Sequence, residues 1–314
     1  MVLIDNYGRP LLNLRIALTQ NCNLHCEYCH REGEEKLAEN SAEMTVEEIV
    51  RIVRIAVSLG ISKVKLTGGE PLMRRDITKI VEGIAAIPSL EDLSMTTNGT
   101  LLDSLAEELR AKGLKRVNIN LPTLNEAVYK KLTGGRLENV LKGVKAAVEA
   151  GLYPVKLNML ILKGVNDHEV LRMIDFARKT ETILQLIELE PINIDNAYYA
   201  AHHKSLDEYE RLLKEKALKI ETRRHMQNRR VYHLPDVNVE IVHPIENTEF
   251  CMHCTRLRVT SDGKLKPCLM RNDNLVDILT PMRNGASDEE LIKLFKLANQ
   301  KREPYNLLST HSLK

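Results

Sequence analysis

The stretch Cys22-Asn23-Leu24-His25-Cys26-Glu27-Tyr28-Cys29 decides how the rest of this chain is interpreted. It places three thiols close enough along the chain for all of them to face one point in space. Thiolates select soft metals, namely zinc, copper(I) or iron–sulfur clusters. A structural zinc site takes four ligands, whereas three Cys on one loop suit a [4Fe–4S] cluster that keeps one iron open. An open iron indicates chemistry rather than a structural role.

Two alternatives stay open for this loop. Disulfides are one, although six Cys among 314 residues are sparse for a stapled secreted domain. Zinc is the other, with His25 or His30 as a fourth ligand. The N-terminus lacks a basic segment followed by a long apolar run, and no stretch of about 18 apolar residues occurs. We therefore expect a cytoplasmic protein with no membrane contact, and reduced thiols in that compartment favour a cluster.

The composition is that of an ordinary globular protein, with 43% hydrophobic and 28% charged residues. The formal net charge is only +2, which gives no case for nucleic acid as a bulk partner. Trp is absent and aromatic residues make up 4%, which argues against stacking platforms for single strands. Any polyanion would have to be bound by a local cluster of Lys and Arg.

Hydrophobic patterning predicts six strands separated by helices, which is typical of βα units with parallel strands. The predicted strands cover residues 12–18, 64–67, 93–97, 116–121, 153–162 and 183–190. The fold class is therefore α/β, an incomplete (βα)6 parallel barrel. The Cys loop follows the first strand and Gly68-Gly69-Glu70-Pro71 follows the second, at the strand ends where such folds build active sites. A capping box at Thr45 and Glu48 begins the first helix, and Asp76 is expected to cap the next.

The βα rhythm changes after Pro191. We expect further helices over 103–112, 136–150, 167–179, 206–218 and 288–298. Short β pieces are expected at 231–234, 237–242, 257–260 and 264–266. We divide the chain into a partial barrel, residues 1–200, and a smaller β-containing segment, residues 201–314.

This C-terminal segment carries a second set of three cysteines, Cys251, Cys254 and Cys268. A turn at Asp262-Gly263 would fold Cys268 back toward the other two, so that one metal could take all three. Zinc with His253 or His243 as fourth ligand is the alternative here. Arg256 and Arg258 follow directly and share one face of the predicted strand, where two guanidiniums could hold a substrate against the metal. The alternative for this Arg pair is a solvated strand face.

These residues resemble a known superfamily. The first Cys set, with Tyr28 inside it and Gly68-Gly69-Glu70-Pro71 after it, is similar to the radical S-adenosylmethionine (radical SAM) superfamily. The second Cys set with Arg256-Leu257-Arg258 is similar to one family within it, the GTP 3',8-cyclases of molybdenum cofactor (molybdopterin) biosynthesis. The resemblance runs from about residue 14 to residue 272.

The resemblance implies two [4Fe–4S] clusters, one on each Cys set, and S-adenosylmethionine as a further cofactor. It implies that the cofactor is cleaved by one electron to a 5'-deoxyadenosyl radical, which takes hydrogen from C3' of GTP. The carbon radical would then attack C8 of guanine, giving (8S)-3',8-cyclo-7,8-dihydroguanosine 5'-triphosphate. It also implies SAM contacts at Tyr28, Gly69, Glu70, Asn120 and Glu190. Ser and Met are frequent in the family at the places of Asn120 and Glu190.

GTP carries about four negative charges, and the sequence has no Gly-x4-Gly-Lys-Ser/Thr loop, so side chains must hold the phosphates. Matching the family's pattern implies GTP contacts at Arg15, Lys65, Thr96, Lys156, Arg256, Leu257 and Arg258. The resemblance gives Arg256 and Arg258 catalytic roles as well. Four of these positions lie on predicted strands, where they could line one cavity. The Arg cluster Arg223, Arg224, Arg229 and Arg230 is interpreted as a solvated or structural face.

The implied partners are GTP, a one-electron reductant, and the cyclic pyranopterin monophosphate synthase that takes the product; a homodimer is compatible with the sequence. Many relatives end in Gly-Gly, whereas this chain ends in Thr310-His311-Ser312-Leu313-Lys314. Rival interpretations are a radical SAM enzyme acting on a peptide or tetrapyrrole, a non-catalytic iron–sulfur electron carrier, and a zinc-stabilised binding protein.

Overall fold

The computed structural model describes residues 2–37 and 43–305. The C-terminal pentapeptide that replaces Gly-Gly lies outside these ranges. Within them, no helix combines the length and the apolar character that a membrane crossing requires.

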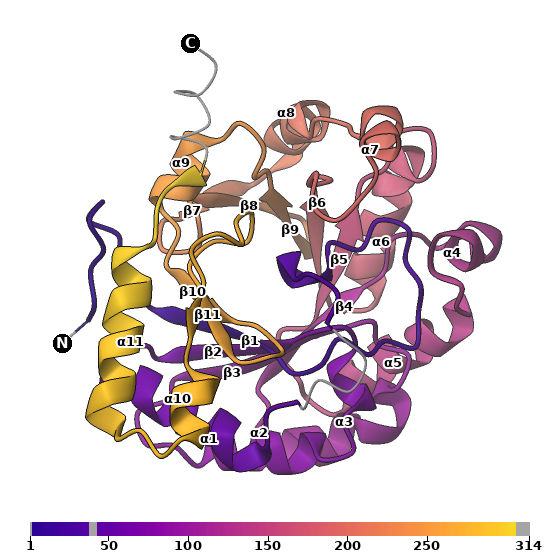
Figure 1. The fold of residues 1–314 in the computed structure, drawn as a ribbon. Coiled ribbons are helices and arrows are strands. Elements are labelled where there is room, and N and C mark those ends of the chain that lie inside the picture. The colour runs from indigo at the N-terminus through magenta and orange to yellow at the C-terminus, as the bar shows by residue number, and fades with distance from the viewer. Residues whose placement is uncertain (1, 38–42, 306–314) are drawn as a thin grey trace.

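Six parallel strands in sequence order form the centre of the sheet (Figure 1). They are β1 (Asn13–Ala17), β2 (Lys63–Thr67), β3 (Asp92–Thr97), β4 (Arg116–Asn120), β5 (Lys156–Leu160) and β6 (Ile183–Ile187). Alternate side chains of β2 point to opposite faces, so that Val64 and Leu66 are fully buried in the core while Lys65 is half-buried. The same alternation on the neighbouring strands builds the core on one side of the sheet and a polar wall on the other.

Helices cover the outer face of the curved sheet, where Figure 1 shows α1, α2, α3 and α5 side by side. The helices that follow the six strands are α1 (Val46–Ser58), α2 (Ile77–Ala85), α3 (Leu102–Ala111), α4 (Glu126–Thr133), α5 (Leu137–Glu149) and α6 (Val170–Lys179). Helix α1 begins at the predicted capping box, and Ile49, Ile52 and Val53 on one of its faces are buried. Its capping residues satisfy backbone N–H groups that the first helical turn leaves without partners.

The C-terminal segment extends both edges of this sheet. Strands β9 (Val237–Val242) and β10 (Arg256–Val259) pair in parallel with β6 and β1 respectively. Outside them lie β7 (Lys219–Arg223), β8 (Arg229–Leu234), β11 (Lys264–Lys266) and β12 (Val276–Asp277). The described residues therefore form a single sheet of twelve strands, in the order β12-β11-β10-β1-β2-β3-β4-β5-β6-β9-β8-β7.

The remaining helices belong to this C-terminal part. They are α7 (Asn196–His202), α8 (Asp207–Lys216), α9 (Thr248–Met252), α10 (Leu279–Arg283) and α11 (Asp288–Gln300). Helix α11, yellow in Figure 1, runs beside β10 and β11 and buries Leu291 and Phe295. Three single 3-10 turns complete the list: η1 (Arg31–Gly33), η2 (Pro71–Met73) and η3 (Asp167–Glu169).

The predicted α/β partial barrel is confirmed, and the predicted strands and longer helices are all present within a few residues. Short elements were missed, namely β7, β12, α4, α7, α9 and α10. The capping role expected of Asp76 is wrong. Its carboxylate accepts hydrogen bonds from Arg74 at 2.9 and 2.7 Å, and no side-chain bond caps α2.

Candidate active site

One large cavity lies at the opening of the barrel, with a volume of about 310 Å³. Its wall contains sixteen of the eighteen residues expected in the site: Arg15, Cys22, Cys26, Tyr28, Cys29, Lys65, Gly69, Thr96, Asn120, Lys156, Glu190, Cys251, Cys254, Arg256, Arg258 and Cys268. Residues separated by more than 250 positions in the chain thus meet in one place. The two exceptions are Glu70 and Leu257, whose side chains are fully buried.

The first cysteine loop is held in the opening by the loop after β2. The N–H of Gly69 donates to the carbonyl of Thr19 at 2.7 Å, and that of Glu70 donates to the carbonyl of Asn21 at 2.7 Å. Side chains would prevent this approach, because a Cβ on Gly69 would lie 2.3 Å from the Asn21 oxygen. At Gly68 the φ angle of 145° also favours glycine. The two glycines therefore let two backbone segments touch beside the cysteines.

Glu70 does not line the cavity, but its buried side chain supports the first cysteine loop. Its carboxylate accepts hydrogen bonds from Thr97 Oγ1 at 2.7 Å and from the N–H of Asn98 at 2.7 Å. The Asn98 amide in turn donates to Asn23 Oδ1 at 2.8 Å, inside the cysteine stretch. Both carboxylate oxygens of Glu70 are thus engaged inside the protein, so the side chain positions the cysteine loop, and the expected SAM contact at Glu70 stays a prediction for its backbone.

The second cysteine set is fixed by two arginines and a hairpin. Arg9 donates to the carbonyl of Cys251 at 2.9 Å, and Arg302 donates to the carbonyl of Cys254 at 2.5 Å. Strands β10 and β11 pair antiparallel around the expected turn, where Gly263 has φ +74°, and this returns Cys268 to the cavity. The prediction that the turn brings Cys268 to the same wall is confirmed.

The thiols of both sets suit a soft metal or an iron–sulfur cluster. None of the six cysteines forms a disulfide. Burial raises the pKa of Cys22 and Cys268, and raises that of Cys26 to about 12, so positive charge from a bound metal is needed to hold thiolates. Among the described residues no three His, Cys, Asp or Glu side chains converge on one ion position. Cluster ligands need not converge in this way, because each binds a different iron.

Strand register explains the row of basic residues in the wall. Arg258 of β10 is the register partner of Arg15 on β1, which is in turn the partner of Lys65 on β2. Thr96 and Lys156 flank Asn118 of β4 in the same manner two strands further on. Parallel strands in register present these side chains on one face. Leu257 lies between two wall residues, and its side chain points into the hydrophobic core; the GTP contact expected at Leu257 stays a prediction for its backbone.

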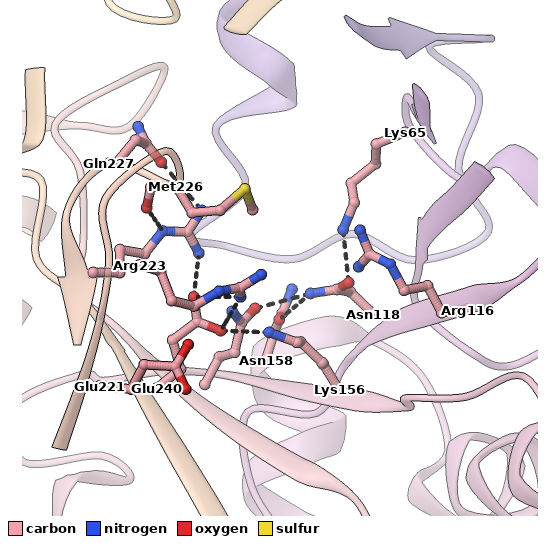
Figure 2. A network of polar contacts seen from close by, with 12 residues as sticks. Lys65, Arg116, Asn118, Lys156, Asn158, Glu221, Arg223, Met226, Gln227 and Glu240 are labelled. Atoms are coloured by element: carbon pink, nitrogen blue, oxygen red, sulfur yellow. Dashed lines mark hydrogen bonds and ion pairs between the residues drawn. The ribbon is translucent and has the colours of Figure 1, made fainter. Parts of the chain in front are cut away.

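A buried carboxylate organises the far side of the cavity (Figure 2). Glu240 on β9 is fully buried and forms ion pairs with Lys156, Arg223 and Arg229. Burial alone would raise the pKa of Glu240, but these cations outweigh it and hold the pKa far below the ordinary value. Burial lowers the pKa of Lys156 to about 8, although Glu240 opposes that shift. At neutral pH both partners are therefore charged.

A chain of hydrogen bonds connects Glu240 to Lys65, one of the basic residues aligned by strand register. Lys65 Nζ donates to Asn118 Oδ1 at 2.6 Å, Asn118 Nδ2 donates to Gln185 Oε1 at 2.8 Å, and Gln185 Nε2 donates to Glu240 at 2.7 Å (Figure 2). Burial lowers the pKa of Lys65, and neighbouring Arg116 and Arg15 lower it further. A bound polyanion would reverse this shift, because opposite charge favours the protonated amine.

Several wall residues were not found from the sequence. Arg223 and Arg229 line the cavity and pair with buried Glu240, which agrees with the structural alternative given for this cluster and not with the solvated one. Arg230 is exposed and pairs with Glu210. Glu32 was not identified at all. Its only sequence signal was its position, three residues after Cys29 and at the start of a charged connection.

The wall carries an excess of positive charge. It contains eleven Lys and Arg residues and five Asp and Glu residues, an excess of six in a chain whose formal net charge is +2. Since this excess lies in a concave site, it attracts anions more strongly than the same charges would on an open surface.

Comparison with known proteins identifies the chain. It is 52% identical over 311 residues to a "Probable GTP 3',8-cyclase" of Thermococcus kodakarensis, covering 97% of this chain and 99% of the relative. A protein of the same description from Methanosarcina acetivorans is 48% identical over 316 residues, covering 98% of this chain and 91% of the relative. The chain belongs to the GTP 3',8-cyclase family.

Two family models match successive parts of this GTP 3',8-cyclase family member. Residues 16–177 match the radical SAM superfamily, and residues 182–308 match the model "Molybdenum Cofactor Synthesis C". Among solved structures, Streptococcus suis SuiB is similar with a TM-score of 0.61 at 20% identity, over 83% of this chain and 61% of SuiB. This chain thus spans less than two thirds of the SuiB chain, and at that identity the likeness shows the fold alone. Membership of the radical SAM superfamily implies S-adenosylmethionine and a [4Fe–4S] cluster.

Proposed function

We propose that this protein is a GTP 3',8-cyclase that converts GTP to (8S)-3',8-cyclo-7,8-dihydroguanosine 5'-triphosphate, the first step of molybdenum cofactor biosynthesis. The observation that carries the proposal is the single cavity shared by two sets of three cysteines and an excess of six positive charges. One Cys set suffices for cleavage of SAM. The second set and the cations have a use only if a large anionic substrate lies between them.

In this proposal Cys22, Cys26 and Cys29 would hold the first [4Fe–4S] cluster, and SAM would bind beside it. When bound, the cluster supplies the electron that cleaves SAM to methionine and a radical able to take hydrogen from C3' of the ribose. The backbone at Tyr28 and Gly69 frames SAM, and Asn120 and Glu190 complete its site. These residues orient the cofactor and exclude water from the radical.

Cys251, Cys254 and Cys268 would hold a second [4Fe–4S] cluster, which would supply a Lewis-acidic binding position for guanine. Burial would raise the pKa of Cys254, but Arg302, Arg256 and Arg258 outweigh burial and lower it. The same guanidiniums would stabilise the negative charge of the thiolates that hold a cluster. Fixing the base beside the ribose brings C3' and C8 together, and this proximity is the main contribution that a protein can make to ring closure.

The triphosphate is held by Arg15, Lys65, Thr96, Lys156 and the two arginines of β10. Arg223 and Arg229 extend this group, and Glu240 holds its three cations together and charged when no nucleotide is bound. The four negative charges of GTP are then met by the wall's excess positive charge, and no Gly-rich phosphate loop is needed.

We further propose residues 1–200 as the radical SAM unit and residues 201–314 as the segment that carries the second cluster. A one-electron reductant is required, and a cyclic pyranopterin monophosphate synthase would take the product. The cytoplasm, which keeps thiols reduced, is the proposed compartment. A homodimer is the oligomeric state that we would test first.

The test is the variant Arg256→Ala/Arg258→Ala, compared with Arg230→Ala. Under anaerobic conditions the double variant should lose conversion of GTP and still bind SAM, because the two arginines lie at the second cysteine set. Arg230→Ala removes an arginine that pairs with Glu210 outside the cavity, and should convert GTP as the wild type does. Unchanged GTP conversion by the double variant would refute the roles assigned to Arg256 and Arg258. Failure of the wild type to convert GTP would refute the assignment of GTP and favour a peptide or tetrapyrrole substrate.

A further inference from the structure

Two buried atoms in the cavity wall lack hydrogen-bond partners and face each other. They are Glu32 Oε2 and Arg258 Nε, which lie 3.9 Å apart. The two residues are 7% and 6% exposed. The two groups form an ion pair at this distance, but neither atom makes a hydrogen bond. Buried polar atoms without a hydrogen bond are costly, so an oxygen that lies beside the pair and bonds to both atoms would be stabilised.

The fold places Glu32 there at a cost in backbone conformation. Arg31 and Glu32 have φ angles of 49° and 51°, in the left-handed region that non-glycine residues rarely adopt. The other carboxylate oxygen is fixed by Thr67 Oγ1 at 2.7 Å and by Arg15 at 3.4 Å. Only Oε2 is therefore available, and its direction toward Arg258 is set by these bonds.

A carboxylate in this position opposes the binding of an anionic nucleotide, so a local gain must offset the repulsion. Burial would raise the pKa of Glu32, but Arg15, His30 and Arg258 lower it to about 2, and the group is ionised at neutral pH. It can then only accept a hydrogen bond, while Arg258 Nε can only donate one. A phosphate has no proton for Glu32. A hydroxyl both donates and accepts through one oxygen, and satisfies both orphaned atoms at once.

The chain positions of the two residues show where such a hydroxyl would come from. Glu32 follows Cys29 of the first cysteine set, and Arg258 follows Cys254 of the second. A group between them lies between the sites proposed for SAM and for guanine. In GTP the ribose carries the hydrogen that the radical removes, and it joins the triphosphate to the base. It has hydroxyls at C2' and C3'.

We propose that Glu32 and Arg258 hold a ribose hydroxyl of the bound nucleotide between them, with Glu32 as acceptor and Arg258 as donor, and so position C3' for the reaction. This inference rests on the proposed function. It makes Glu32 a determinant of specificity for ribonucleotides, in a site where cations outnumber carboxylates.

The test measures binding without turnover. The holoprotein, with its clusters reconstituted anaerobically and without reductant, is titrated with GTP, 2'-deoxy-GTP and 3'-deoxy-GTP in a calorimeter. Wild type should bind one of the two deoxy analogues about tenfold to a hundredfold more weakly than GTP, because a buried charged group then loses its partner. The analogue affected identifies the hydroxyl. Wild type that binds all three nucleotides equally, as it would with only a water in the gap, would overturn the inference.

Variants separate this role from a structural one. In Glu32→Ala the ratio between GTP and the affected analogue should fall close to one, and Glu32→Gln, which keeps the shape of the side chain, should give an intermediate ratio. Glu188→Gln is the matched control, since it removes another acidic residue of the wall, bound to His203 at 2.9 Å, and should keep the wild-type ratio. A wild-type ratio in both Glu32 variants would overturn the inference while leaving GTP cyclisation intact. Failure of wild type to bind GTP would overturn the proposed function as well.

Discussion

Replacing Glu240 by Gln tests whether one carboxylate holds together the cations that are proposed to bind the triphosphate, on what we call the phosphate side of the cavity. Glu240 is fully buried and pairs with Lys156, with Arg229 at 3.1 Å and with Arg223 at 3.3 Å. Glutamine keeps the shape and one acceptor but removes the charge. The three cations then remain close together without a counterion, and two of them, Lys156 and Arg229, are themselves buried.

The expected loss of stability is large. Breaking a buried ion pair from one side costs about 3–5 kcal/mol, because an uncompensated charge stays behind. For a chain of this size each kcal/mol corresponds to about 2 °C, so the midpoint of thermal unfolding should fall by about 6–10 °C. The double variant Glu240→Gln/Lys156→Met should lose less than the two single variants together, because it removes both members of the strongest pair.

The assay is anaerobic calorimetry of the holoprotein, with Glu82→Gln as the matched control. Glu82 pairs with Lys112 on the surface, and its loss should cost less than about 1 kcal/mol. If Glu240→Gln also loses less than about 1 kcal/mol, the carboxylate does not hold the cations together, and the proposed arrangement of the phosphate side is refuted.

Three further predictions follow from single residues. GTP should bind more weakly as pH rises through about 8, because Lys156 with its pKa of about 8 loses its proton there; Lys156→Gln should lack this step in a pH series of GTP titrations. Gly69→Ala should lower iron content and SAM affinity in the reconstituted protein, since its Cβ would lie 2.3 Å from the carbonyl of Asn21, and unchanged values would contradict the close approach. Leu257→Ala should lose about 2–5 kcal/mol of stability by calorimetry yet bind GTP normally, and weakened binding without destabilisation would restore a substrate contact.

The sequence predicted the scaffold because its signals were local. Alternating apolar residues marked each parallel strand, and the capping box at Thr45 and Glu48 marked the first long helix. The cysteine spacing indicated the cluster chemistry without any structure. Arg15, Lys65, Thr96 and Lys156 could be expected to meet because alternate residues of neighbouring parallel strands share a face.

The residues that were missed depend on contacts between distant segments. Arg223 and Arg229 lie in a basic run that looks solvated until β9 brings Glu240 beside it. The supporting role of the Glu70 side chain could not be predicted, because only the fold shows that Thr97 and Asn98 engage both of its oxygens. Asp76 was expected to cap a helix with its side chain, but Arg74, two residues earlier, donates to that carboxylate instead.

The measurement that tests the central claim most directly is anaerobic turnover. The reconstituted protein is given SAM, dithionite and GTP, with ATP in place of GTP as the control, and 5'-deoxyadenosine and nucleotide products are followed by mass spectrometry. We predict that 5'-deoxyadenosine and a cyclic product of GTP form together with GTP and not with ATP. Formation of 5'-deoxyadenosine with GTP unchanged would keep the radical SAM assignment and contradict GTP as the substrate.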